Sequence, residues 1–149
     1  MKGRIISCFS CVGKTHYVLN NLHLESCIDH DFYDYMYRGN LGENWMGVYM
    51  TRMRQLQKKF EYVYVNSTPE IIAELPKDSI LVYPYPNLKN EWVQRAKNRG
   101  GESAFPKLLE KKWDEWIAAC ESWTGKKYMV NSGEYLSNVF DRFKTIHVN

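Results

Sequence analysis

The fold is decided by residues 5–15, which read Ile5-Ile6-Ser7-Cys8-Phe9-Ser10-Cys11-Val12-Gly13-Lys14-Thr15. The aliphatic start of this stretch is typical of a short strand, and the residues that follow it are small. Beyond the stretch, Tyr17, Val18 and Leu22 recur at helical spacing. The sequence therefore predicts a strand, a loop and a helix in immediate succession.

The loop matches the spacing of a Walker A phosphate-binding loop, G-x-x-x-x-G-K-[ST], at every position but the first glycine. Gly13 lets the backbone curl so that N–H groups face phosphates, and the start of the helix adds its positive dipole end. Lys14 can reach the β- and γ-phosphates, and the Thr15 hydroxyl can bind Mg²⁺. Cys8 stands in place of the first glycine, where we expect the tightest bend of the loop. The alternative is a Gly-Lys-Thr that only begins a helix.

Extended and helical patterns alternate along the rest of the chain. Extended runs are expected at 27–28, 62–65, 79–83 and 127–130, and helices at 44–60, 68–75, 88–98, 105–123 and 135–143. No repeat or low-complexity linker divides the sequence. The alternation predicts an α/β three-layer sandwich with a parallel sheet of about five strands, of the P-loop NTPase type. We expect residues 1–149 to form a single domain.

Composition narrows the function classes. Hydrophobic residues make up 44% of the 149 residues and charged residues 25%, the balance of a folded protein. The net charge of +3 is too small to imply a nucleic-acid or membrane partner. No run approaches the roughly 20 apolar residues that span a bilayer, and the sequence has no signal-peptide core. We therefore expect a cytoplasmic location, which is the host cytoplasm if the protein is phage-encoded.

Four cysteines leave two further alternatives open. Cys8 and Cys11 form a C-x-x-C, but the second pair that a zinc site needs is missing. A redox pair would place its first cysteine directly at the helix start. Here Gly13-Lys14-Thr15 intervenes, so we expect ordinary thiols.

An acidic pair follows the second expected strand. Asp29 and Asp31 can bind a hydrated Mg²⁺, or act as a base toward an acceptor hydroxyl. Alternatives are a solvated turn that caps a helix and, with less support from the weak preceding strand, a phosphatase with an aspartyl nucleophile. We expect His30, between the two carboxylates, to be exposed.

These motifs resemble those of small phage-type P-loop kinases, which are similar to nucleoside monophosphate kinases of the adenylate kinase type and to hydroxymethyluracil DNA kinases. Such proteins read F-P-G-V-G-K-[ST], then D-x-D-S, and later Y-P and R-x-x-x-R-G. The counterparts here are residues 9–15, Asp29-His30-Asp31, Tyr83-Pro84 and residues 95–100. Ser10 and Cys11 replace the usual proline and glycine, and Phe32 replaces the serine.

The resemblance implies ATP and Mg²⁺ as cofactors and gives each matching residue a role. ATP would be held by Phe9, Ser10, Cys11, Val12, Gly13, Lys14 and Thr15, and the metal by Thr15 and Asp29. The catalytic residues would be Lys14, Asp29, Asp31, Arg95 and Arg99. The two arginines would lie on a short lid around 95–105 and neutralise the transferring phosphoryl group. The alternative for them is a solvent-exposed helix face.

The expected function is transfer of the γ-phosphoryl group of ATP to a nucleotide-class acceptor, as in nucleoside and deoxynucleoside monophosphate kinases. One alternative is a kinase for the hydroxymethyl group of a modified pyrimidine in DNA, for which a basic edge would track the phosphates. That edge comprises Arg52, Arg54, Lys58 and Lys59. Another is a non-catalytic nucleotide-binding protein with a degenerate loop. The aromatic cluster around 33–38 is a candidate base pocket or part of the core. We expect a nucleotide substrate as partner, no membrane, and a monomer or homodimer.

Overall fold

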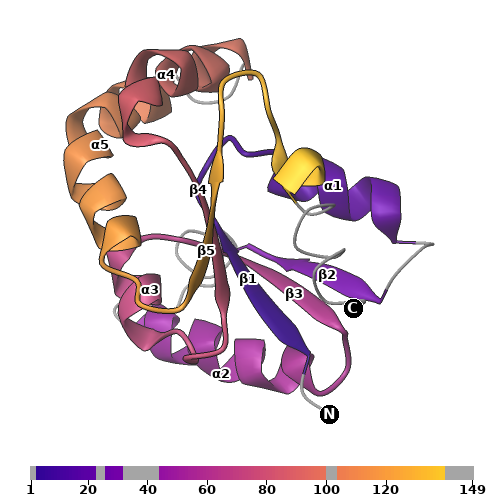
Figure 1. The fold of residues 1–149 in the computed structure, drawn as a ribbon. Helices are drawn as coiled ribbons and strands as arrows, with labels where there is room; N and C mark the ends of the chain where they lie inside the picture. Colours follow the sequence, from indigo (N-terminus) through magenta and orange to yellow (C-terminus); the bar gives the residue numbers. More distant parts are fainter. Residues whose placement is uncertain (1–2, 23–25, 32–43, 100–103, 140–149) are drawn as a thin grey trace.

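The computed structural model describes residues 3–22, 26–31, 44–99 and 104–139. Figure 1 shows a twisted sheet with helices on both faces. In the described residues the strands are β1 (Arg4–Cys8), β2 (Cys27–His30), β3 (Tyr62–Asn66), β4 (Ile80–Pro84) and β5 (Lys126–Val130). Every neighbouring pair is parallel, and the spatial order is β2-β3-β1-β4-β5. The predicted α/β fold with a parallel five-stranded sheet is confirmed.

The helices are α1 (Lys14–Asn21), α2 (Trp45–Gln57), α3 (Pro69–Glu74), α4 (Lys89–Asn98) and α5 (Ala104–Glu121), with a 3₁₀ turn η3 (Pro86–Leu88) before α4. In Figure 1, α1 and the helical residues 136–139 lie on one face of the sheet, and α2, α3 and α5 lie on the other. Helix α4 packs against α5. No described helix is both long and apolar enough to cross a membrane.

The central strands are apolar because both of their faces are covered. β4 is buried at all five positions and β1 at four of five, whereas the edge strand β5 begins with two exposed lysines. Helix α3 begins as its sequence predicts, since Pro69 occupies its first turn and Thr68 Oγ1 accepts from the Ile71 amide at 3.4 Å.

The strand order reverses at β1, and this places the site. The chain leaves β1 through α1 toward β2, whereas later connections add β4 and β5 on the opposite side. Cys8, the last residue of β1, lies beside Asn66, the last residue of β3, and beside Val82 in the middle of β4. Ligands of parallel sheets bind at such a reversal, beyond the carboxyl ends of the strands.

Some predictions fall partly outside the described residues. The expected lid around 95–105 corresponds to the end of α4 and the first residues of α5, and 100–103 lie outside them. The last expected helix is described only as far as residue 139. The aromatic cluster around 33–38 lies wholly outside them.

Candidate functional site

The loop between β1 and α1, residues 9–13, is anchored at both ends. The Phe9 amide donates to the Val82 carbonyl at 2.9 Å, and its ring meets Trp113 and Trp116 edge-on at 5.4 and 6.4 Å between centroids. At the other end the Gly13 carbonyl accepts from the Tyr17 amide at 2.9 Å and starts α1. Because the Phe9 side chain is buried, only its backbone is available to a ligand.

Two loop residues have left-handed backbone, Cys11 with φ of 62° and Gly13 with φ of 88°. For a residue with a side chain this conformation costs about 1–2 kcal/mol. Cys8 is not in this region, so the expectation that the first Walker A position carries the tightest bend is wrong. The chain stays extended through Cys8 because that residue still pairs with β3 and β4. Burial raises the pKa of the Cys8 thiol to about 12, which makes it an inert core group.

Three successive loop carbonyls are bonded from outside the loop. The Ser10 carbonyl accepts from the Trp92 indole at 3.0 Å, and the Cys11 carbonyl from Arg95 Nη1 at 3.1 Å. The Val12 carbonyl accepts from the Leu136 amide at 2.8 Å. In a trans peptide the carbonyl and the next N–H point in opposite directions. The amides of residues 11–13 are therefore directed away from these donors, and amides arranged on left-handed turns form anion-binding nests.

Three predicted site residues meet where α1 begins. Lys14 Nζ forms an ion pair with Asp29, and Thr15 Oγ1 donates to Asp29 Oδ2 at 2.6 Å. Lys14 Nζ is also 3.9 Å from Asp31 Oδ2. Asp29 reaches this point because α1 packs against β2. The loop lysine, the loop threonine and the acidic pair thus form one cluster at the carboxyl end of the sheet.

The donors in this cluster suit a hard cation. A threonine hydroxyl and two carboxylates offer only oxygen ligands, which Mg²⁺ prefers. Thr15 and Asp29 are already in contact, and Asp31 Oδ2 is 3.9 Å from the Lys14 ammonium. The residues present therefore fit a magnesium ion accompanied by a phosphate ligand.

His30 is buried, with 4% of its surface exposed, so the expectation that it is exposed is wrong. Its ring stacks on Tyr49 of α2 at 4.1 Å between centroids, with Nε2 2.9 Å from the Tyr49 carbonyl oxygen. In return the Tyr49 hydroxyl donates to the His30 carbonyl at 2.7 Å. Burial lowers the pKa of His30, and the charges of Arg52 and Lys14 act in the same direction. Through these bonds with Tyr49, the His30 ring and backbone hold the chain between Asp29 and Asp31 against α2.

The two arginines predicted for a lid lie in different surroundings. The Arg95 side chain is only 10% exposed, and its guanidinium lies between the rings of Trp92 and Tyr135, at 3.8 and 4.1 Å. Besides the Cys11 carbonyl it bonds the Glu134 carbonyl at 2.7 Å and Glu91 Oε2 at 3.1 Å. A guanidinium engaged on the Cys11 and Glu134 carbonyls is not free to act on a ligand, so the structure does not support a lid role for Arg95.

Arg99 is exposed and follows the last residue of α4. Its guanidinium carbon is 5.3 Å from the centroid of the Phe105 ring. Burial raises the pKa of the Cys11 thiol, and the nearby charges of Arg99 and Arg95 oppose that rise. Arg99 therefore lies near the loop while keeping a solvent-facing side chain.

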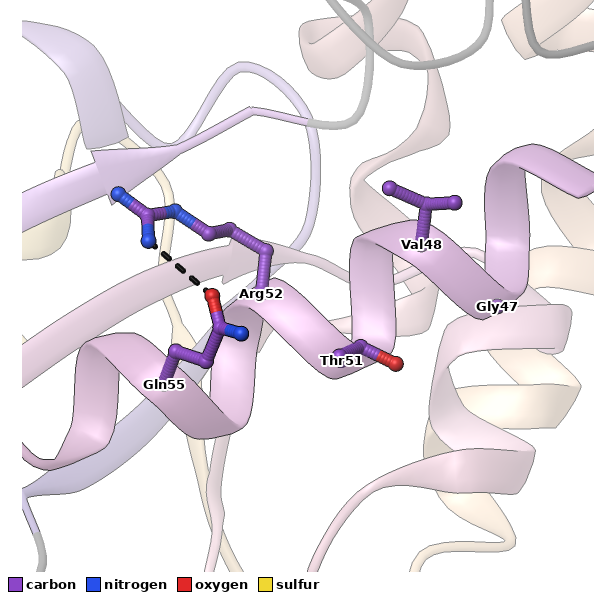
Figure 2. A pocket seen from close by; sticks show the side chains of 5 residues that line it. All are labelled: Gly47, Val48, Thr51, Arg52 and Gln55. Atoms are coloured by element: carbon purple, nitrogen blue, oxygen red, sulfur yellow. Dashed lines mark hydrogen bonds between the residues drawn. The ribbon is translucent and has the colours of Figure 1, made fainter.

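Two hollows accompany the site. One of about 400 Å³ opens beside the start of α1 and is lined by Gly13, His16, Tyr17, Asn20, Asn21, Tyr135 and Ser137. The other, of about 300 Å³, lies on α2 and is lined by Gly47, Val48, Thr51, Arg52 and Gln55. Figure 2 shows Arg52 extended along the helix, away from Val48, with Nη1 3.1 Å from Gln55 Oε1. The charge of Arg52 contributes to lowering the pKa of His30, after the larger effect of burial.

Sequence reasoning missed the residues that hold the loop from behind, which are Glu91, Trp92, Tyr135 and Leu136. The spacing of Glu91 and Arg95, four apart on a predicted helix, was the one usable signal. Nothing in the local sequence shows that Trp92 and Leu136 bond loop carbonyls, because those contacts join distant segments.

Comparisons with known proteins agree with the fold. No family model and no curated protein matches the sequence. The structure is similar to a tunicamycin resistance protein from Deinococcus radiodurans, with a TM-score of 0.61 and 12% identity over 98% of this chain and 96% of that one. It is also similar to a shikimate kinase from Bacteroides thetaiotaomicron, with a TM-score of 0.61 and 11% identity over 100% of both chains. An uncharacterised protein from Eubacterium ventriosum matches over 100% of both chains with a TM-score of 0.52 and 14% identity. Likenesses at these identities show the fold alone, which this chain shares with a tunicamycin resistance protein and a shikimate kinase.

Proposed function

We propose that the protein is an ATP-dependent phosphotransferase that acts on a nucleotide-class acceptor, in the manner of nucleoside monophosphate kinases. The observation that carries the proposal is the cluster of Lys14, Thr15 and Asp29 at the start of α1. Beside it lies a loop whose amides point away from the side chains that bond its carbonyls. Such an arrangement suits positioning and charge stabilisation, which account for most of the catalysis of phosphoryl transfer.

The donor nucleotide uses the loop and the hollow beside it. The amides of residues 11–13 bind phosphate oxygens, Lys14 neutralises the β- and γ-phosphates, and Thr15 with Asp29 holds Mg²⁺. The base occupies the 400 Å³ hollow, where Tyr135 offers an aromatic surface and Asn20 and Asn21 offer amide groups. Aromatic faces and amides are the side chains that bind nucleobases.

The acceptor lies on the side of the acidic pair. Asp31 has the more exposed side chain of the two, 39% against 18% for Asp29. It orients the acceptor and takes the proton when the nucleophile is a hydroxyl group. Arg99 neutralises charge on the transferring phosphoryl group, and Arg52 on α2 attracts an anionic acceptor.

Two alternatives each have one supporting observation. Arg54, Lys58 and Lys59 are exposed at the end of α2, and this basic edge favours a kinase for a hydroxymethyl group in DNA. The strained backbone of Cys11 favours a nucleotide-binding protein that has lost transfer.

The deciding experiment incubates the protein with Mg²⁺ and γ-labelled ATP and offers a panel of acceptors. The panel contains deoxynucleoside monophosphates, nucleosides, duplex DNA with hydroxymethyluracil, and shikimate, because one structural neighbour is a shikimate kinase. Label on a monophosphate, absent with Lys14→Ala, supports the proposal. Label on DNA supports the first alternative, and ATP binding without transfer to any acceptor supports the second. Absence of ATP binding would refute all three.

A further inference from the structure

We infer that one face of α4, formed by Glu91, Trp92 and Arg95, is a clamp that holds the phosphate loop in its anion-binding shape. The inference rests on the proposed function, since it makes these three side chains positioning residues for a phosphate that they do not touch. We call them the α4 clamp.

The clamp acts on carbonyl groups and not on the ligand. Trp92 fastens the Ser10 carbonyl and Arg95 the Cys11 carbonyl. Each fastened carbonyl fixes its peptide plane and so the direction of the following N–H group. Two of the three amides that face the phosphates are therefore oriented by α4, at residues 11 and 12.

This loop needs support from outside because position 11 is a cysteine with left-handed backbone. A glycine there would adopt the left-handed conformation without cost, but Cys11 adopts it under strain. The hydrogen bond that opposes relaxation of this residue comes from a charged donor, the stronger kind.

Glu91 keeps Arg95 in place and ties a second segment to the clamp. Its Oε2 accepts from Arg95 Nη2 at 3.1 Å and from the Gly133 amide at 3.0 Å, and its Oε1 accepts from Ser132 Oγ at 2.5 Å. Arg95 also bonds the Glu134 carbonyl. A single ion pair on α4 thus fastens both the phosphate loop and the turn after β5.

That turn leads directly into the wall of the base hollow. The Tyr135 ring lies against Gly13, such that a Cβ on Gly13 would be 3.3 Å from Tyr135 Cδ1. The clamp therefore fixes the position of the phosphate loop relative to Tyr135, which lines the base hollow. Loosening it should weaken binding of a bare polyphosphate as well as of ATP, because the loop itself relaxes.

The test compares Arg95→Lys and Glu91→Gln with Glu115→Gln, an exposed glutamate on α5 that serves as the matched control. Binding of ATP and of inorganic tripolyphosphate is measured by calorimetry. Exchange at the loop is measured without ligand, by hydrogen–deuterium exchange of the Leu136 and Tyr17 amides, which donate to the Val12 and Gly13 carbonyls. A lysine carries a single donor nitrogen, so it cannot reproduce the two separate guanidinium nitrogens that bond the Cys11 and Glu134 carbonyls. We expect Arg95→Lys to weaken the binding of ATP and of tripolyphosphate by about tenfold, the scale of one charged hydrogen bond. We also expect it to speed exchange of the Leu136 and Tyr17 amides. We expect Glu91→Gln to act in the same direction and the control to match the parent.

Three outcomes would overturn the inference. Tripolyphosphate affinity and loop exchange equal to the parent in both variants would show that the loop holds its own shape. Faster exchange in β3 and β4 as much as in the loop would show that the three residues only stabilise the fold. A parent protein that binds neither ATP nor tripolyphosphate would remove the proposed function, and with it the role of the clamp in phosphate binding.

Discussion

Cys11 shows how a phosphate loop can depart from its consensus at the residue scale. In this chain the left-handed conformation falls three residues after the position where the consensus has its first glycine. Cys8 instead ends a buried strand, and only 1% of its surface is exposed. The two cysteines therefore respond in opposite ways to replacement by glycine.

We predict that Cys11→Gly raises the free energy of unfolding by up to about 1 kcal/mol, because it relieves the left-handed strain. Cys8→Gly should lower it by about 2 kcal/mol, since it removes a buried side chain and loosens a central strand. Urea unfolding of the two variants and the parent measures both changes. Greater stability of Cys8→Gly than of Cys11→Gly would contradict the placement of the backbone strain at Cys11 and of the buried side chain at Cys8.

Under the proposed function, we expect phosphate recognition to depend more on Lys14 than on any other residue. Lys14→Ala should remain folded, because the lysine contacts the acidic pair at the rim of the sheet and not the core. Turnover of ATP should fall about 10²-fold or more, as for other groups that stabilise developing charge. Steady-state kinetics and circular dichroism check the two parts. Lys107→Ala, which removes an exposed lysine of α5, is the control and should match the parent.

At the scale of elements, the contact between β2 and α2 positions the acidic pair. Two reciprocal bonds join the elements, from Tyr49 to the His30 backbone and between the His30 ring and the Tyr49 carbonyl. The ring is stacked on Tyr49 and buried, and this burial disfavours its protonated form. Protonation of His30 should therefore weaken the contact between β2 and α2.

We predict that the protein loses stability as the pH falls below about 6.5, the ordinary pKa of histidine. The pKa of His30 is lowered in the folded protein, so the unfolded chain takes up the proton first. The stabilisation is complete above the ordinary pKa and is lost as the pH falls through the lowered one. Urea unfolding at pH 7.5 and 5.5 measures the loss. His30→Phe should flatten this dependence, whereas His16→Gln, at an exposed position of α1, should leave it unchanged.

Helix α4 separates two arginines that the sequence places together. Arg95 faces the loop carbonyls, whereas Arg99 lies past the helix end and faces solvent. If Arg99 meets the phosphoryl group during transfer, Arg99→Ala should lower kcat at least about tenfold and leave ATP affinity within twofold. Arg99→Lys should recover little, because an ammonium cannot fork onto two oxygens. Steady-state kinetics measures kcat and calorimetry measures ATP affinity. A kcat equal to that of the parent in both variants would contradict a role of Arg99 in phosphoryl transfer.

Across the whole molecule, the sequence predicts what depends on local pattern and misses what depends on contacts between distant segments. The parallel sheet and the succession of strand, loop and helix follow from periodicity and motif spacing. The nearness of Thr15 and Asp29 follows from the resemblance, which assigns both residues to one metal. The burial of His30 and the engagement of Arg95 do not follow. The first depends on Tyr49 of α2. The second depends on the Cys11 and Glu134 carbonyls, which belong to segments far from α4 in the sequence. A charged or titratable residue beside a motif appears exposed and free until its partner is known.

Ligand binding should stabilise the whole fold. A ligand bound only by the folded state adds about 2.7 kcal/mol at a hundred times its dissociation constant. We therefore predict that Mg²⁺ with ATP raises the melting temperature of the parent in a concentration-dependent way. Tripolyphosphate should give a smaller rise, because it leaves the base hollow unused. Thermal melts of the parent and of Lys14→Ala check this, and an equal shift in both proteins would contradict it.

The bond between the Leu136 amide and the Val12 carbonyl has a consequence for synthesis. Residues 10–12 leave the ribosome early, but the donors that fasten their carbonyls belong to α4 and to the segment after β5. Under the proposed function, a nascent chain therefore completes its nucleotide site only after residue 136 has been made. We expect ATP to bind only near the end of folding, so that a partly made chain does not retain nucleotide.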